Sequence, residues 1–175
     1  MKLGTLARRF LIPGWYVSIV CYMRFRAQVS PRAEVELSGN LRLGHGTIVG
    51  SFTKIKCAAG VLTTGVHTEI ATGCFLDAQA GGLSIGNGVL IGANSVIVTG
   101  SYKHDRIGVA LSEQGLTFKR TRIGDNTFIG SNCVVLGGSD NGSDVIVAPV
   151  SVVSGKVPPG VVVSGNPARI IFKRR

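Results

Sequence analysis

The polar side chains best suited to acid–base chemistry lie in one stretch of the sequence, residues 101–120. It contains His104, one of three histidines in the chain, and Asp105 follows it directly. An imidazole with its ordinary pKa of about 6.5 can take a proton from a hydroxyl or an amine at neutral pH. A neighbouring carboxylate or carbonyl would fix the tautomer of the ring, and Asp105, Asp77 and Glu113 are the carboxylates to consider. The alternative is that His104 is a solvated surface residue.

The elements that must position this stretch fit within a single domain. The chain has 175 residues and a formal net charge of +10, from 19 basic and 9 acidic side chains. Only 16% of its residues are charged, whereas 45% are hydrophobic. This composition excludes a disordered chain, and no unbroken apolar run reaches the roughly 20 residues that a membrane-spanning helix needs.

Glycine and cysteine narrow the class of protein further. The chain has 25 glycines without a collagen-like period, which indicates many ordered turns. Its four cysteines lie far apart in the sequence with no CxxC pair, so we expect neither a zinc knuckle nor a disulfide framework. Free thiols are typical of a reducing compartment, and we expect a cytoplasmic protein.

An internal repeat of 21 residues organises the first half of the chain. Three consecutive copies place apolar or small residues at matched positions. The first copy has Leu41, Leu43, Gly44, Thr47, Val49 and Ile55; the second has Leu62, Thr64, Gly65, Thr68, Ile70 and Leu76; the third has Leu83, Ile85, Gly86, Val89, Ile91 and Ile97.

Within each copy the shorter period is six residues: an aliphatic residue, often a glycine after it, and a small residue four places on. Six residues suit neither a helix nor an alternating strand, but they suit one short strand with one turn. Three such units close a triangle, which predicts a parallel β-helix with the aliphatic residues inside. The period is clearest at Ile123, Ile129, Val135, Asn141, Val147 and Val153, where only Asn141 departs from it.

Three segments carry a resemblance to a known family: IGNGVLIGANSVI at 85–97, IGDNTFIGSNCVVL at 123–136 and PPGVVVSGNPARII at 158–171. They resemble the hexapeptide-repeat acyltransferases, in particular the acetyltransferases for maltose, galactosides, xenobiotics and polysaccharides. The resemblance implies an all-β fold, a left-handed parallel β-helix, and a homotrimer with sites between subunits. It also implies acetyl-CoA as the acyl donor, with no metal.

The resemblance assigns roles to several residues. It implies that His104 is the general base, because the repeat is interrupted at 101–120 and the family carries its catalytic histidine on a loop at this point. Asp77, in LDAQAGG, would face the acceptor, although an aspartate there also suits a turn. Asn94 and Glu113 are the other acceptor-side candidates, and Asn94 equally suits a left-handed corner. For coenzyme A, the donor-side candidates are Phe128, Ser151, Lys156, Gly165, Arg169 and Lys173.

A metal site is the weaker interpretation of the histidines. His45 and His67 occupy neighbouring copies of the repeat and could lie close together. Related carbonic-anhydrase-like proteins hold a metal with an HxxxxH pair, whereas the gaps here are 67 − 45 = 22 and 104 − 67 = 37 residues. We therefore expect turn histidines rather than metal ligands.

The chain is expected to divide into three parts. Residues 1–28 contain five basic residues, no acidic residue and an apolar run, which predicts a helical segment. This segment could cap the first coil, could contact the inner face of the cytoplasmic membrane, or could do both. Residues 29–171 form the β-helix, with the loop 101–120 extruded from it, and residues 172–175 form a basic tail.

The expected function is a CoA-dependent O-acetyltransferase that modifies a sugar hydroxyl of a bacterial surface polysaccharide or its precursor. One alternative is N-acetylation of an amino sugar, since an amine could use the same base. A second alternative is a β-helix without catalytic activity that serves as a scaffold or binding module. Nucleic acid is not an expected partner, because the aromatic platforms that bind single strands are missing from the sequence.

Overall fold

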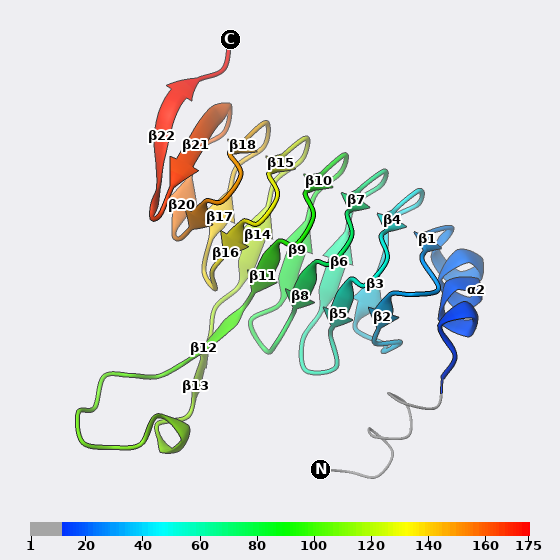
Figure 1. Cartoon of the computed structure of the whole chain (residues 1–175), viewed down its shortest axis with the longest axis horizontal. Coiled ribbons are helices and arrows are strands. Elements are labelled where there is room, and N and C mark those ends of the chain that lie inside the picture. Colours follow the sequence, from blue (N-terminus) through cyan, green and yellow to red (C-terminus); the bar gives the residue numbers. More distant parts are fainter. Residues whose placement is uncertain (1–11) are drawn as a thin grey trace.

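A computed structural model describes residues 12–175 and shows a parallel β-helix with a triangular cross-section (Figure 1). The prism has three parallel sheets, which we name A, B and C. Successive short strands along the chain belong to sheets A, B and C in turn, so each coil contributes one strand to each sheet. The hydrogen bonds within each sheet join one coil to the next. The all-β class and the parallel β-helix predicted from the six-residue period are therefore confirmed.

The strands of the three sheets and of a separate ribbon have the following bounds. Sheet A comprises β1 (Gln28–Val29), β4 (Ile48–Val49), β7 (Glu69–Ile70), β10 (Leu90–Ile91), β15 (Phe128–Ile129), β18 (Ile146–Val147), β21 (Val161–Gly165) and β22 (Ala168–Lys173). Sheet B comprises β2 (Glu34–Val35), β5 (Lys54–Lys56), β8 (Phe75–Asp77), β11 (Val96–Val98), β16 (Val134–Val135) and β19 (Val152–Val153). Sheet C comprises β3 (Leu41–Arg42), β6 (Leu62–Thr64), β9 (Leu83–Ile85), β14 (Thr121–Ile123), β17 (Asp140–Asn141) and β20 (Lys156–Val157). The ribbon comprises β12 (Gly100–Tyr102) and β13 (Leu116–Phe118).

The strand register matches the sequence repeat. Leu41 pairs with Leu62 and Leu62 with Leu83, a step of 62 − 41 = 83 − 62 = 21 residues. After the interruption the step shortens, since Ile129 pairs with Val147 and 147 − 129 = 18. Three six-residue units make 18, so the early coils carry three additional residues each.

The core is a stack of aliphatic side chains that point into the prism. One residue from each short strand faces inward, and its neighbours face out, which is the two-residue alternation of a β-strand. Fully burying an aliphatic side chain contributes about 1.5–3 kcal/mol, so these columns are a major stabilising part of the fold. The inward residues of sheets A and B include Val49, Ile55, Ile70, Leu76, Ile91, Ile97, Ile129, Val135, Val147 and Val153, each at most 2% exposed.

The corner between sheets A and B is closed by small buried side chains that bond to the neighbouring coil. Ser95 Oγ donates to the carbonyl of Gly130 at 2.9 Å, and Cys133 Sγ donates to the carbonyl of Ala148 at 3.2 Å. In the other direction, Ser95 Oγ accepts from the backbone N–H of Cys133 at 3.2 Å. These bonds satisfy backbone groups that the turn would otherwise leave buried and unpaired.

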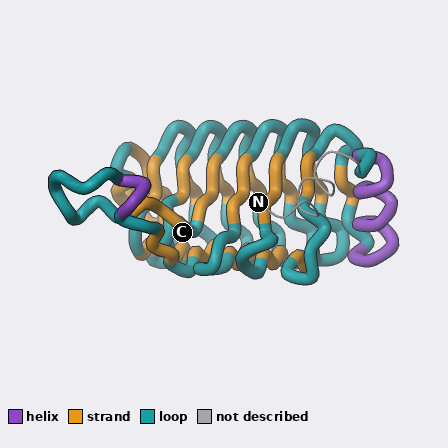
Figure 2. The backbone as a smooth tube through the Cα atoms, turned by 90° about the horizontal axis from the view of Figure 1, so that it is seen from below, coloured by secondary structure: helices purple, strands orange, loops and turns teal. Residues whose placement is uncertain are grey.

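The interruption of the repeat is a two-stranded antiparallel ribbon that leaves the prism between sheets B and C. It begins at β12, directly after the third copy of the repeat, and returns through β13 to β14. Its tip contains one turn of 3₁₀ helix, η1 (Leu111–Glu113). The ribbon leaves the prism part-way along its length, between β11 and β14, and its tip points away from α2 (Figures 1 and 2).

The opposite end of the prism carries helix α2 (Gly14–Phe25), which confirms the helix expected in residues 1–28. Val17 and Cys21 of α2 are buried against Ala27 and Val29 of the first coil. Lys2, Arg8 and Arg9, which the sequence analysis included in this segment, lie outside the described residues. Among residues 12–175, no helix is long and apolar enough to cross a membrane.

The C-terminal residues form a strand where the sequence analysis expected a tail. β22 folds back on β21 in antiparallel pairing, and Lys173 lies opposite Val161. Arg174 continues the contact, since its N–H donates to the carbonyl of Gly160 at 2.8 Å. A tail beginning at 172 is therefore wrong for Phe172 and Lys173, because main-chain bonds hold both in the sheet.

Asn141 is the one polar residue in a column that otherwise holds apolar side chains in the neighbouring coils. It lies between Ile123 and Val157 and is fully buried. Among the described residues, neither its side-chain oxygen nor its side-chain nitrogen has a hydrogen-bond partner. A buried polar group without a partner costs about 1–3 kcal/mol.

We therefore expect Asn141→Val to raise the free energy of unfolding by about 1–3 kcal/mol, because it removes two unpaired polar groups and restores the aliphatic stack. Thermal and urea unfolding measure the change. The reciprocal variant Val147→Asn, in the neighbouring buried column, is the control and should lower the stability. An Asn141→Val protein less stable than the unaltered chain would show that the amide is stabilising.

Candidate active site

The ribbon holds His104 just beyond its paired strands. Tyr102 lies opposite Leu116, and the N–H of Lys103 donates to the carbonyl of Gly115 at 3.0 Å. The backbone is thus fixed up to the residue before His104. The histidine side chain itself is exposed, which leaves it accessible to a substrate.

Gln114 closes the tip of the ribbon, a role that the sequence analysis missed. Its side chain is buried, and its Oε1 accepts from the N–H of Arg106 at 3.1 Å. Its Nε2 donates to the carbonyls of Arg106 and Val109, each at 2.9 Å. One amide therefore joins three backbone groups across the tip. The sequence around Gln114, SEQG at 112–115, has no local pattern that distinguishes a buried glutamine from an exposed one.

The imidazole of His104 contacts a backbone carbonyl. Its Nδ1 lies 3.2 Å from the carbonyl oxygen of Tyr102. A carbonyl oxygen only accepts hydrogen bonds, so the contact requires the proton to be on Nδ1. The lone pair of the neutral ring is then on Nε2, on the far side of the ring from Tyr102, where it can accept a proton from a substrate.

None of the three carboxylates considered from the sequence bonds to this ring within the described residues. Asp77 lies at the root of the ribbon, on β8, where its Oδ2 accepts from Nε2 of Gln79 at 2.8 Å. Asp105 and Glu113 are exposed on the ribbon itself. The group that orients His104 in this structure is therefore a carbonyl, the other possibility that the sequence left open.

The root of the ribbon is held by hydrogen bonds to Thr99, the residue before β12. Thr99 Oγ1 accepts from the N–H of Gln79 at 2.8 Å, and Lys119 N–H donates to the carbonyl of Thr99 at 2.8 Å. Asp77, Gln79 and Thr99 thus form one connected group where the ribbon leaves the prism. Asp77, on β8 of the prism, therefore lies beside the root of the ribbon, and His104 lies further out on the ribbon itself.

Asn94 lies at a different corner of the prism from the ribbon. It precedes β11, whereas the ribbon follows β11. Its backbone is left-handed, with φ of 58°, as is that of Asn132 at the same corner of the next coil, with φ of 57°. Asparagine tolerates this conformation better than most residues, which gives Asn94 a structural reason to be where it is.

Two of the donor-side candidates, Ser151 and Gly165, contact each other. The hydroxyl of Ser151 is buried and accepts from the N–H of Gly165 at 3.1 Å. Ser151 therefore lies in the interior, where it positions Gly165 rather than facing the surface. Gly165 has φ of 103° and precedes the turn into β22, on which Arg169 is exposed.

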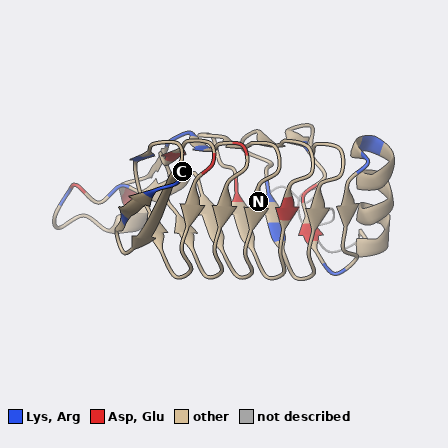
Figure 3. Ribbon diagram, turned by 90° about the horizontal axis from the view of Figure 1, so that it is seen from above, with Lys and Arg blue, Asp and Glu red and all other residues tan. Residues whose placement is uncertain are grey.

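The remaining donor-side candidates are Phe128 and Lys173, which also belong to sheet A, and Lys156, which belongs to sheet C. Phe128 points outward from sheet A, Lys156 is exposed on sheet C, and Lys173 lies at the far end of β22 from Arg169. The structure does not gather these residues into one cluster within the protomer. Figure 3 shows the charged residues scattered over a prism surface that is otherwise mostly uncharged.

The other two histidines and the four cysteines show no arrangement suited to metal binding or catalysis among the described residues. His45 and His67 are neighbours, as their positions in the repeat suggested, with ring centroids 5.8 Å apart. Among residues 12–175, no three His, Cys, Asp or Glu side chains are grouped so that they could hold a metal ion. Burial raises the pKa of all four cysteine thiols, that of Cys21 to about 11, which disfavours the reactive thiolate.

Comparison with known proteins identifies the repeat. Residues 82–102 and 120–148 match the family model described as the hexapeptide repeat of succinyl-transferase, and the gap between them falls on the ribbon. Among curated relatives, the protein named acetyltransferase YvoF of Bacillus subtilis is 35% identical over 94 residues, which is 53% of this chain and 48% of YvoF. WbbJ of Escherichia coli, named as a lipopolysaccharide biosynthesis O-acetyl transferase, is 34% identical over 99 residues, 52% of this chain and 50% of WbbJ. The chain thus spans about half the length of these two relatives.

Among solved structures, a mutant of AntD, an N-acyltransferase from Bacillus cereus in complex with dTDP and coenzyme A, has the same fold. The TM-score is 0.78 at 16% sequence identity, over 90% of this chain and 88% of the AntD chain. The comparison supports the left-handed winding that the sequence resemblance implied.

The amide of Gln114 yields a prediction about the order of the ribbon. Gln114→Leu keeps the side-chain volume but removes three hydrogen bonds, so we expect amide exchange in residues 103–115 to accelerate at least about fivefold, since one hydrogen bond contributes about 1 kcal/mol. Hydrogen exchange with mass spectrometry measures this. Glu113→Leu, on the adjacent exposed residue, is the control and should leave the exchange unchanged. Equal exchange in the two variants would contradict the role of Gln114.

Proposed function

We propose that this chain, a β-helix that matches the hexapeptide-repeat model at residues 82–102 and 120–148, transfers an acyl group from coenzyme A to a sugar. The observation that carries the proposal is the contact between His104 Nδ1 and the carbonyl of Tyr102, at 3.2 Å. With Nδ1 bonded to that carbonyl, the basic nitrogen of the exposed side chain is Nε2. The names of YvoF and WbbJ support acetyl transfer in particular.

In the proposed reaction, His104 acts on the acceptor. Its Nε2 takes the proton of the sugar hydroxyl while the oxygen attacks the thioester carbonyl, and the imidazolium is stabilised by the Tyr102 carbonyl behind it. A new C–O bond forms, the C–S bond breaks, and the proton on Nε2 passes to the departing thiolate. The products are an ester and a free thiol, and the histidine returns to its starting state.

Asp77 and the ribbon have positioning roles in this proposal. The amide of Gln79 holds one oxygen of Asp77, and the other oxygen remains able to accept from a sugar hydroxyl. Backbone N–H groups near the ribbon would stabilise the oxyanion of the tetrahedral intermediate, typically about 10²- to 10³-fold per donor. Asp105 and Glu113, both exposed on the ribbon, are available to the acceptor.

Acetyl-CoA is the proposed donor, and it supplies an activated acyl group together with several phosphates. Exposed cations on the C-terminal strands fit those phosphates. Arg169 makes a single weak contact, from Nη1 to the neighbouring carbonyl of Ala168 at 3.5 Å, so its guanidinium is available to an anion. Lys156 and Lys173 are likewise exposed, and Gly165 allows close approach of a ligand to the backbone.

A homotrimer would bring these groups together. Within one protomer the ribbon and the donor-side residues lie on different faces, so a site made from both needs a second copy. Sheet A offers apolar side chains for the association on two neighbouring strands, since Leu90 and Phe128 are 46% and 40% exposed. We propose that Phe128 lies at such a boundary, beside a donor bound between subunits.

The proposed acceptor is a sugar hydroxyl of a bacterial surface polysaccharide or its precursor, which the name of WbbJ supports. N-acylation of an amino sugar is the second candidate. It is favoured by the similarity in fold to AntD, an N-acyltransferase. An O-acyl product is cleaved by hydroxylamine and an amide is not, so treatment of the product distinguishes the two.

We expect His104→Ala to lower kcat about 10²- to 10⁴-fold, the usual contribution of a general base, with little change in KM for acetyl-CoA. Release of free thiol from acetyl-CoA, measured against a panel of sugars and amino sugars, gives the rates. His45→Ala, which removes an imidazole at another corner, is the control and should retain activity. Equal rates for His104→Ala and the unaltered protein would reject the base, and no turnover with any acceptor would favour a binding module.

The donor side has a separate test. We expect Arg169→Gln combined with Lys173→Gln to raise KM for acetyl-CoA severalfold while kcat stays within about twofold, because each cation lost removes a charge-assisted contact to phosphate. Arg42→Gln, an exposed cation on the N-terminal half of sheet C, is the control and should leave both constants unchanged. An unchanged KM in the double variant would place the phosphates elsewhere.

A further inference from the structure

The outer face of helix α2 is apolar, although it faces solvent. Met23 is 77% exposed and Trp15 is 58% exposed, whereas Val17 and Cys21 on the opposite face are buried against the first coil. Ile19 lies three or four positions from each of the other four exposed apolar residues, so the five form one stripe along the helix. This α2 face consists of Trp15, Tyr16, Ile19, Tyr22 and Met23.

The residue types on the α2 face are those of membrane interfaces. Trp and Tyr carry an apolar ring with a polar edge, and they concentrate where lipid headgroups meet acyl chains. Cations flank the stripe: Arg24 lies in the last turn, and the guanidinium of Arg26 lies 5.6 Å from the ring centroid of Tyr22. The first acidic residue of the whole chain is Glu34, so nothing in the preceding sequence offsets these charges.

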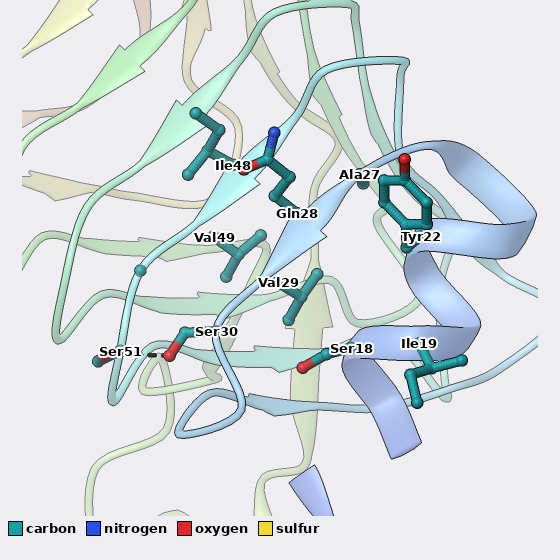
Figure 4. Close-up of a pocket in the computed structure, with 11 residues that line it drawn as sticks. Ser18, Ile19, Tyr22, Ala27, Gln28, Val29, Ser30, Ile48, Val49 and Ser51 are labelled. Carbon is teal, nitrogen blue, oxygen red and sulfur yellow. Dashed lines mark hydrogen bonds between the residues drawn. The ribbon is translucent and has the colours of Figure 1, made fainter. Parts of the chain in front are cut away.

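The apolar surface continues from the helix onto sheet A. A groove beside α2 is lined by Ile19 and Tyr22 on one side and by Gln28 and Ile48 on the other. Figure 4 shows these side chains around the groove, contributed by the helix and by strands β1 and β4. Ile48 is itself 42% exposed, so it extends the apolar area of the α2 face.

Charge decides which partner fits this surface. A second copy of the chain would have to offer acidic groups to Arg24 and Arg26, yet each copy has a net charge of +10 and only 9 acidic residues. Asp140 is already within 3.3 Å of Arg122, and Glu34 within 2.7 Å of Lys54. An anionic lipid surface complements both the cations and the aromatic stripe.

We propose that the α2 face binds the surface of a bilayer containing anionic phospholipid, with the helix lying in the headgroup region. The helix has 12 residues, which suits a position in the plane of the interface rather than across the bilayer. The ribbon leaves the prism between β11 and β14 and points away from α2, so α2 can contact lipid without covering His104 (Figures 1 and 2). The proposal does not depend on the acyl-transfer activity.

Flotation of the full chain with vesicles tests the proposal. The probes are phosphatidylcholine vesicles and vesicles in which one third of the lipid is phosphatidylglycerol. We expect co-flotation only with the anionic vesicles, and less of it at high salt. Trp15→Glu combined with Met23→Glu should abolish it. Arg24→Gln should lower the partition coefficient about fivefold, since one basic residue near an anionic surface contributes about 1 kcal/mol.

Ile170→Glu combined with Ile171→Glu is the matched control, because these side chains are 51% and 58% exposed on β22 at the opposite end of the prism and the variant adds the same two charges. It should float like the unaltered chain.

Thermal unfolding of each variant establishes that it is folded, and thiol release with a water-soluble acceptor is expected to be unchanged by the α2 variants. Failure of the unaltered chain to float with anionic vesicles would overturn the proposal. Unchanged flotation of the Trp15→Glu, Met23→Glu variant would also overturn it, as would a change in oligomeric state without any vesicle binding, which would assign the α2 face to a second copy.

Discussion

The constraint on which the structure depends is that three side chains from each coil must share one narrow triangular interior. Aliphatic residues fill the middle of each side, and only small residues fit at the corners, where the backbone turns. At those corners the backbone groups would be buried without partners, and hydroxyl or thiol groups such as those of Ser95 and Cys133 bond to them. Packing and hydrogen bonding therefore require the same small residues, which is why the repeat is so regular.

This coupling explains how much of the fold could be predicted from the sequence. An inward aliphatic residue every six positions has one simple geometrical solution, and the register of the three sheets follows from it. The excursion at 101–120 was visible as the place where the period stops. Asn141 interrupted the pattern in the sequence, and in the described residues its buried amide is the side chain whose oxygen and nitrogen both lack a hydrogen-bond partner.

The candidate site was less predictable, because its contacts join residues with no common pattern. The partner of His104 is a main-chain carbonyl, and main-chain groups have no signature in a sequence. The amide of Gln114 bonds to the backbone of Arg106, eight residues away, and this contact exists only once the ribbon has folded. Ser151 was chosen for its position in the resemblance, yet the same six-residue rule that predicts the fold places it in the interior. The reversal of β22 could not be read from a repeat, since it is the point where the repeat ends.

That reversal also determines how sheet A ends. A stack of identical parallel coils has no intrinsic length, because the last strand offers the same unpaired edge to any further coil. In this protein β22 runs antiparallel along β21, so the edge that sheet A presents has the opposite polarity and lies outside the register of the coils. A coil from another molecule cannot extend this sheet as a continuation of the spiral, and growth into a filament is blocked on that side by the last six residues of β-structure.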